Sequence, residues 1–438
     1  MSRKISSRLI IFLVALLGSF ATSVAQEAYG GYSPYTIFGV GDLAVQGSAY
    51  NKSMGGVGIA GRNNRYLNIM NPAAVTARDS LSFMSSFSLN SKNRIYRQGD
   101  MISANNVFNI NDVVISFPIQ RVSAMMLGIV PYSDMGFQFM EYYTDPDVIG
   151  NIGDVYYSAD GIGSIYKAFA AAGVTFLDRI SLGAEVDYYF GELTKTFVTQ
   201  FPDSYSSISN NNILQLNGVG GKFGLQYEQP LGSGVSMVVG ATYSTGANMH
   251  GYFEDSKFMI RSTGQSDTNS FRVDTLGISR NLKLASELGV GISVKKTNKW
   301  MFEFNYTRSD WRNTGIESVS GYNSASTPFN ASVSEAYRLG FEYIPNITDI
   351  RYYFNRVAYR AGAYYKKEYY TLSGHDIASM GITLGATLPV FRWYNGISLG
   401  VEFGQRASLT GNLTRERFVN FSIGINIFDI WFQKPQYE

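Results

Sequence analysis

Cysteine is absent from the 438-residue sequence, which excludes disulfides, a lipidated cysteine and thiolate metal sites. Histidine is scarce as well, with two residues, so metal centres built from several histidines cannot form. Charged residues make up only 16% of the chain, below the roughly 25% of soluble domains. The sequence therefore lacks the side chains that a soluble surface and most catalytic centres need, and no cofactor or metal is implied.

Long apolar runs are also missing, because no segment after the N-terminus has 18 or more consecutive apolar residues. This absence excludes a helical membrane protein. Aromatic residues account for 15% of the chain, and there are 45 glycines. Low charge without helical spans indicates a membrane protein whose apolar residues occupy alternate positions of strands, which is a β-barrel.

The N-terminus has the features of a secretory leader. Three basic residues precede an apolar stretch at 9–20, and Ser23-Val24-Ala25 supplies small residues for cleavage. The stretch has 12 residues, fewer than the roughly 20 of a spanning helix. We therefore expect residues 1–25 to be a signal peptide. The remaining chain has 33 basic and 34 acidic residues, so it offers no basic stripe for nucleic acid.

Apolar and polar residues alternate along many segments of about ten residues, as they do in barrel strands. Ile180, Leu182 and Val186 share one face of such a segment, whereas Glu185 and Asp187 share the other. The first face would contact lipid, and the second would line the lumen, where water can solvate the carboxylates.

Further charges of both signs fall on the predicted lumen face: Lys283, Glu287, Glu303, Arg338, Glu342, Arg360 and Glu402. Mixed signs argue against a strongly ion-selective pore. Paired charges that hold an internal segment are the simpler interpretation. Alternatively, Arg338 and Arg360 bind the carboxylate of an amphipathic substrate.

The lengths of the connections predict the topology. Short connections, which face the periplasm in such barrels, are expected at 120–121, 177–179, 229–234, 295–299, 345–355 and 389–396. Longer external loops are expected near 91–106, 144–160, 200–211, 253–278 and 313–332, with brief ones near 371–375 and 409–415. Six periplasmic turns with both termini on one side make 14 strands. Aromatic residues beside the short turns predict an interfacial girdle: Trp300, Phe391, Trp393, Tyr394, Trp431 and Phe432.

The predicted fold is thus all-β, a 14-stranded antiparallel transmembrane β-barrel over residues 80–430 with a periplasmic tail at 431–438. Residues 26–79 are rich in glycine and turn residues and show no sustained alternation. A barrel of this size is wider inside than its side chains can fill, so we expect residues 26–79 to form a plug, or hatch.

Two motifs suggest chemistry but lack its context. Residues 56–61 spell a dinucleotide-binding fingerprint, yet no apolar strand precedes them and no βαβ unit follows. Close backbone packing in the plug explains these glycines better. His375-Asp376 lies in a predicted loop near Ser373, but neighbouring positions do not make a triad. The sequence therefore predicts no enzyme, with a barrel-embedded lipid hydrolase as a minor alternative.

The N-terminal motifs resemble those of the FadL-type long-chain fatty acid transporters of outer membranes, in a divergent branch. The resemblance rests on the stretch 33–42, on a glycine run followed by an Asn-Pro-Ala tripeptide before the first strand, and on the plug-motif residues Gly55, Gly56, Gly58, Asn71, Pro72 and Ala73. It implies a monomeric 14-stranded barrel with an N-terminal hatch. In that family the third strand carries a kink that opens toward lipid. The predicted third strand has a matching break, with Pro131, Tyr132, Ser133 and Gly136 as the lateral-exit kink.

The resemblance implies a passive outer-membrane channel for hydrophobic, fatty-acid-like molecules, which enter from the external loops and leave sideways through the kink. The implied partners are outer-membrane lipid and the substrate. The alternative is a FadL-like barrel that serves as a binding, shuttle or assembly subunit of a protein secretion system.

Overall fold

The structure of the chain is a computed structural model. It describes residues 31–79, 81–143, 145–201, 206–261, 272–277, 282–317, 328–390, 395–409 and 413–430. The predicted leader, the predicted tail and every predicted girdle aromatic except Trp300 lie outside these ranges. No helix within them is long and apolar enough to cross a membrane.

The described residues form mostly strands. Four short helices are η1 (Pro34–Ile37), α2 (Ala49–Lys52), η2 (Pro72–Thr76) and α3 (Pro146–Ile152), with a further turn of helix at η4 (Tyr353–Arg356). The strands are β1 (Asp42–Leu43), β2 (Ser82–Gln98), β3 (Met101–Gln120), β4 (Ser123–Tyr142), β5 (Tyr156–Phe176), β6 (Ile180–Gln200), β7 (Ser206–Gly232), β8 (Val235–Arg261), β9 (Arg272–Gly277), β10 (Lys283–Leu284), β11 (Glu287–Lys296), β12 (Trp300–Asp310), β13 (Phe329–Ala331), β14 (Val333–Tyr343), β15 (Ala358–Leu372), β16 (His375–Pro389), β17 (Gly396–Arg406) and β18 (Arg415–Ile430).

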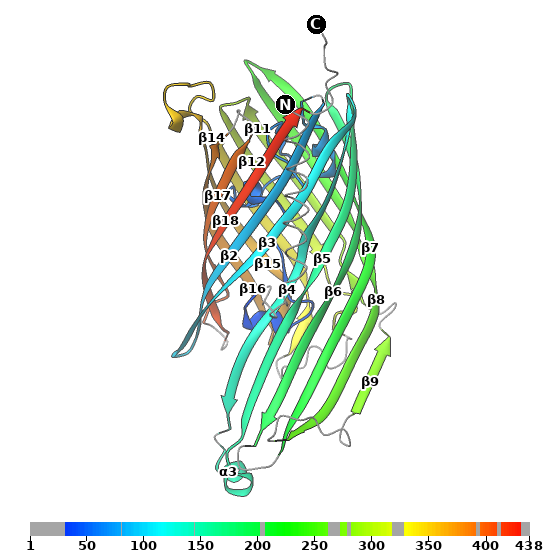
Figure 1. Cartoon of the computed structure of the whole chain (residues 1–438), viewed down its shortest axis with the longest axis vertical. Coiled ribbons are helices and arrows are strands. Elements are labelled where there is room, and N and C mark those ends of the chain that lie inside the picture. Colours follow the sequence, from blue (N-terminus) through cyan, green and yellow to red (C-terminus); the bar gives the residue numbers. More distant parts are fainter. Residues whose placement is uncertain are drawn as a thin grey trace, which may run out of the picture.

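Fourteen of these strands close into one antiparallel barrel (Figure 1). Each strand pairs with the next along the chain, β8 pairs with β11, and β18 returns to pair with β2 over its whole length. The short strands β1, β9, β10 and β13 add to this wall without extending its circuit. The predicted 14-stranded barrel is therefore confirmed.

The alternation read from the sequence determines which face points outward. On β6, Leu182 and Val186 are 44% and 62% exposed, whereas Glu185 and Asp187 are buried inside. Because side chains alternate across a strand, one face can be apolar while the other is polar. The outer face is apolar around the barrel, as a membrane-spanning wall requires.

Two rows of aromatic side chains border this apolar face. Trp300 pairs with Tyr343, which pairs with Tyr359 at the end that holds the short turns. Six residues further along, Tyr337 pairs with Tyr365 and lies beside Tyr306 (ring centroids 5.0 Å apart). Amphipathic rings gather at membrane–water interfaces, so the row beside the short turns suits one edge of the apolar band. Trp300, the one residue of the predicted girdle within the described ranges, lies in the row beside the short turns.

Three details of the topology were predicted wrongly. Much of the segment expected as a loop at 253–278 is strand, because β8 continues to Arg261 and β9 spans Arg272–Gly277. Residues 91–106 do not form a long loop, because β2 and β3 continue to a turn of two residues after Gln98. Lys283 is exposed and its neighbour Leu284 is buried, the reverse of the predicted facing. The ladder is interrupted between β10 and β11, and this interruption changes the phase of the alternation.

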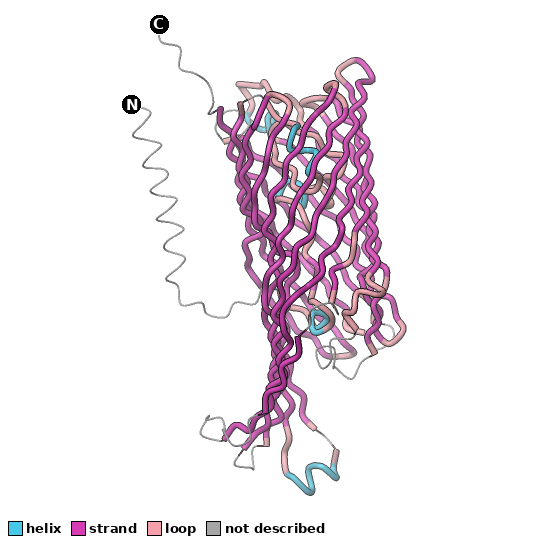
Figure 2. Tube along the Cα trace, turned by 90° about the vertical axis from the view of Figure 1, so that its right-hand side faces the viewer, coloured by secondary structure: helices cyan, strands magenta, loops and turns pink. Residues whose placement is uncertain are grey.

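Several strands continue far beyond the apolar band. β7 and β8 have 27 residues each, whereas a transmembrane strand needs roughly 9–11. The outer parts of β4 to β8 form a sheet that projects from the end opposite the short turns, with α3 at its tip (Figures 1 and 2). The barrel therefore carries a large external sheet on one side only.

Residues 31–79 lie inside the barrel and pack against its wall (Figure 1). Their apolar side chains join three buried clusters. The largest lies toward the projecting sheet and combines η1 residues with side chains from β4 to β8 and from β15 and β16. A second lies around η2, and the third is a small group around Tyr50 and Met54. The core of the molecule is therefore the interface between the N-terminal segment and the barrel.

Candidate functional site

The predicted kink in the third barrel strand is a β-bulge. Pro131 pairs with Tyr166 and Ser133 pairs with Ile165, so Tyr132 has no partner in β5. Its ring turns inward and meets the edge of the Tyr189 ring (centroids 4.9 Å apart). Pro131 has no N–H to donate to the ladder, and proline inside a sheet is therefore found mainly at bulges. The strand bends at this bulge.

The wall is incomplete beside this bulge. β3 and β4 pair only from Gln120–Ser123 to Val113–Ile129. Beyond that point the outer half of β3 pairs with β2 alone, and the outer half of β4 pairs with β5. We call this gap between the two strands, bounded by residues 101–112 and 130–142, the seam.

The N-terminal segment covers the β4 side of the seam. β1 pairs with β4, with Asp42 opposite Asp134 and Leu43 opposite Ser133. Further along, Ser33 N–H donates to the Gly136 carbonyl (2.7 Å). Around residues 132–136 the backbone edge of β4 thus bonds to the chain's own N-terminal segment rather than to β3.

The plug-motif glycines allow this segment to approach the wall. Gly55 and Gly56 have φ values of +73° and +75°, a region that other residues rarely adopt. The Gly55 N–H donates to the Thr383 hydroxyl (2.8 Å). At Gly58 an added Cβ would lie 2.9 Å from Asn68 Oδ1, so a side chain does not fit there either.

The Asn-Pro-Ala residues form the start of η2. Asn71 Oδ1 accepts from the Ala73 N–H (3.0 Å), and its amide donates to the Ile59 carbonyl (2.8 Å). Asn71 and Pro72 lie against Gly224 of β7, where an added Cβ would clash with both. The motif therefore holds the segment against glycines of the barrel wall.

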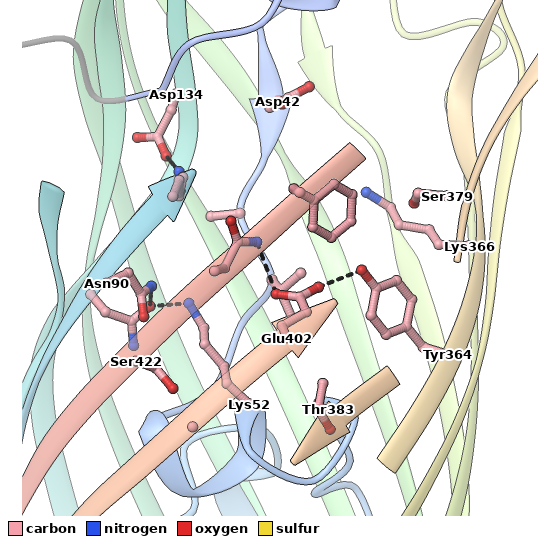
Figure 3. Close-up of a pocket in the computed structure, with 18 of the residues that line it drawn as sticks. Asp42, Lys52, Asn90, Asp134, Tyr364, Lys366, Ser379, Thr383, Glu402 and Ser422 are labelled. Atoms are coloured by element: carbon pink, nitrogen blue, oxygen red, sulfur yellow. Dashed lines mark hydrogen bonds and ion pairs between the residues drawn. The ribbon is translucent and has the colours of Figure 1, made fainter. Parts of the chain in front are cut away.

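A cavity of about 130 Å³ lies between the N-terminal segment and the wall and reaches the seam. Ile110 and Asn111 of β3, Pro131 of β4 and Leu43 of β1 line its seam side. Six basic residues, Lys52, Lys92, Arg94, Arg338, Lys366 and Arg406, face five acidic ones, Asp42, Asp134, Glu368, Glu402 and Glu416. Figure 3 shows several of them pointing into it from β1, α2 and the strands around them. The cavity is therefore strongly polar.

Most of these charges pair with each other. Asp42 binds Arg406 (2.7 Å) and Arg94 (3.1 Å). Burial alone would raise the pKa of the Asp42 carboxyl, but the two guanidinium groups hold it well below its usual range. Lys92 binds Asp134 (2.6 Å), which ties β2 to β4 across the seam. Of the eleven charged residues that line the cavity, the sequence predicted only Arg338 and Glu402 as lumen-facing charges. The ion pairs themselves could not be predicted, because they join residues tens to hundreds of positions apart.

The two candidate carboxylate-binding arginines lie in different places. Arg360 is buried, bound to Glu342 (2.8 Å) and stacked over the Tyr50 ring, and it does not line the cavity. Arg338 lines the cavity and donates to the Thr307 hydroxyl (3.2 Å). Among the ion pairs between described residues, none involves Arg338 or Lys52, and Lys52 donates to Asn111. Arg338 and Lys52 are thus the cations of the cavity that lack a close acid.

The side of the cavity toward the projecting sheet is closed by packing. Phe38, Trp311, Tyr369 and Tyr370 belong to the largest buried cluster, and the Phe38 and Phe329 rings stack (centroids 5.8 Å apart). A tightly packed apolar cluster of this size has no passage for a solute. A route from outside to the cavity therefore requires η1 to move.

The residues of the hydrolase alternative lie at an external turn. His375 begins β16 and is exposed, and Asp376 pairs with Lys367 (2.8 Å). Ser373 belongs to the turn before them. No group of three or more potential metal ligands occurs among the described residues.

Comparison with known proteins places the chain in a family and a fold. The BamG family model matches residues 1–438. No curated protein matches the chain. Among solved structures, the toluene transporter TbuX of Ralstonia pickettii is 15% identical (TM-score 0.60; 86% of this chain, 97% of that one). The toluene transporter TodX of Pseudomonas putida is 13% identical (0.58; 89% and 100%), and a FadL homologue of Pseudomonas aeruginosa is 11% identical (0.52; 88% and 98%). The predicted likeness to FadL-type barrels is confirmed at the level of the fold.

Proposed function

The chain belongs to the BamG family, and from the geometry of its seam we propose that it is a passive outer-membrane channel for hydrophobic molecules. The single observation that carries the proposal is the interrupted ladder between β3 and β4 beside the lumen cavity. A wall without ladder bonds over this stretch offers a lateral exit toward lipid. Barrels of this fold are named for toluene transport, which agrees with such a substrate class.

The charges that line the cavity narrow the proposed substrate class to amphipathic molecules with an anionic head. Arg338 and Lys52 line the cavity and form no ion pair among the described residues, and a guanidinium binds a carboxylate through two parallel bonds. The exposed apolar residues Ile110 and Ile129 flank the seam and suit an apolar tail that leaves for lipid. A fatty-acid-like molecule fits both parts.

Transport requires the N-terminal segment to act as a hatch. The signal peptide, the plug at residues 26–79 and periplasmic termini remain part of this proposal. β1 covers the edge of β4, and η1 completes the apolar cluster that closes the external side. Displacing residues 33–44 would expose the seam and, at the same time, loosen the apolar cluster. One movement would therefore open the route on both sides of the cavity.

A reversible cross-link tests the proposal. Leu43→Cys and Ser133→Cys occupy paired positions of β1 and β4, and the native chain has no cysteine to interfere. Uptake of a labelled fatty acid by cells carrying the oxidised protein should fall severalfold and recover after reduction. The matched control joins Phe302→Cys to Phe341→Cys, a pair in the lipid-facing wall away from the N-terminal segment. Equal uptake by the oxidised and reduced Leu43–Ser133 protein would exclude lateral exit by this movement.

A second function is favoured by the projecting sheet. The external side of the lumen is closed, whereas the outer part of β4 near Phe139 and Met140 is exposed and unpaired with β3. An open strand edge is a template for another chain, so a binding or assembly role in a protein secretion system is the alternative. A photo-crosslinker at Met140 should then capture one outer-membrane or secreted protein in cells. The control position is Val186, which faces lipid.

A further inference from the structure

A second cavity lies at the end of the barrel that holds the short turns. Its volume is about 310 Å³. The N-terminal segment contributes residues 62–65 and 76–78, and the wall contributes the ends of β7, β11, β12 and β14 with the turn between β11 and β12. It lies on the side of the N-terminal segment away from η1, so a transported molecule leaving through the seam would not enter it.

Basic side chains dominate this cavity. Six line it, Arg62, Arg65, Arg78, Lys295, Lys296 and Lys299, against two acids, Glu228 and Glu342. Both acids are already engaged. Glu228 binds Arg62 (3.2 Å) and Lys295 (3.0 Å), and Glu342 binds Arg360 outside the cavity. An excess of four positive charges therefore remains among the lining residues.

Two of the arginines are held in place without an acid among the described ion pairs. Arg65 is 6% exposed and donates to Asn298 of the β11–β12 turn. Arg78 donates to the Val75 and Ser82 carbonyls (2.9 and 3.1 Å), and burial lowers its pKa to about 10. Asp79 follows Arg78 in the chain but accepts from Asn64 (3.0 Å) and does not line the cavity. Arg78 is partly buried and already donates from all three nitrogens, the third to the Ser116 hydroxyl. Arg65 is buried, held by Asn298 and without an acid among the described ion pairs, so its guanidinium group is prepared to bind an anion.

We propose that this cavity is an anion-binding site for an acidic segment of a periplasmic protein. Carboxylates suit the fork geometry of Arg65, while Lys296 and Lys299 on the exposed rim attract negative charge from a distance. Only three apolar residues, Ala77, Trp300 and Met301, line the cavity. An acyl chain would find no apolar path there, so a peptide is favoured over a lipid.

Arg62, Arg65 and Arg78 belong to the N-terminal segment, whereas Lys295 to Lys299 belong to the wall. An acidic segment bound between them would fasten the N-terminal segment to the barrel from the periplasmic side. The partner would thus act on the same segment that covers the seam. The binding site itself does not depend on the transport proposal.

The test is binding of a fluorescent hexaglutamate peptide to the purified full-length protein in neutral detergent, followed by anisotropy. We expect saturable binding of one peptide that weakens as salt rises. Lys296→Gln/Lys299→Gln changes only rim residues, so the barrel should fold, and the affinity should fall about tenfold. Adding Arg65→Gln should lower it further.

The control variant Lys257→Gln/Arg312→Gln removes the same charge from exposed residues at the opposite end and should bind as the parent does. If both variants lost peptide affinity equally, the binding would depend on net charge alone, and the proposed site would be wrong. Two competitors are added, vesicles of anionic phospholipid and inorganic phosphate. If either displaced the peptide at a concentration of negative charge below that of the peptide itself, the assignment to an acidic peptide would be wrong.

Discussion

Single residues decide how closely the N-terminal segment approaches the wall. Gly224 of β7 is the clearest case, because a Cβ there would overlap Asn71 Oδ1 and lie 2.9 Å from the Pro72 ring. Gly224→Ala should lower stability by about 1–3 kcal/mol, the usual cost of overpacking. Thermal unfolding checks this, with Gly150→Ala as control, since an added Cβ at Gly150 meets nothing within 4 Å. Equal melting temperatures for the two variants would mean that the wall yields at Gly224.

Ion pairs at the residue scale differ by their burial. Asp42 lies in the lumen between two arginines, whereas Asp310 pairs with Arg312 at the surface. Asp42→Asn leaves buried guanidinium charge without its acid and should cost about 3–5 kcal/mol. Asp310→Asn should cost at most about 1 kcal/mol. Urea unfolding measures both, and a small effect at Asp42 would mean that Glu416 and Glu368 compensate for its loss.

At the scale of elements, the local alternation of apolar and polar residues predicts most of the strands. Alternation is a property of neighbouring residues, so strands such as 180–190 and the count of 14 could be read directly. Residues 91–106 have the composition of a loop because polar residues replace the apolar ones on the outer face there: Ser91, Asn93 and Asn106 lie on the exposed side of β2 and β3, and Asn106 donates to the other two. The bulge at Tyr132 was predictable from proline. The seam beside it and the cation cluster around Asp42 were not, since both arise from strands far apart in sequence.

The same reasoning predicts how strand positions respond to charge. Val290 lies in the apolar band, 43% exposed, and Ile208 lies in the projecting sheet, 49% exposed. Val290→Glu places an acid against lipid. A basic residue at the membrane midplane costs about 2–4 kcal/mol, and an acid costs somewhat less. Ile208→Glu places it in water. Membrane assembly, measured as the heat-modifiable fraction, should fall only for Val290→Glu, and a similar fall for both would contradict the assigned band.

For the whole molecule, the N-terminal segment and the wall form one structure, because the segment supplies part of every buried cluster. A barrel of 14 strands is too wide for its own side chains to fill. The intact protein should therefore conduct ions poorly in a planar bilayer, since packed apolar residues close one side of the lumen and paired charges occupy the other. Removing residues 31–79 should give a stable, larger conductance if the wall still closes, which heat-modifiability on gels checks independently. A folded barrel whose conductance does not change on removal would show that wall side chains, rather than this segment, close the pore.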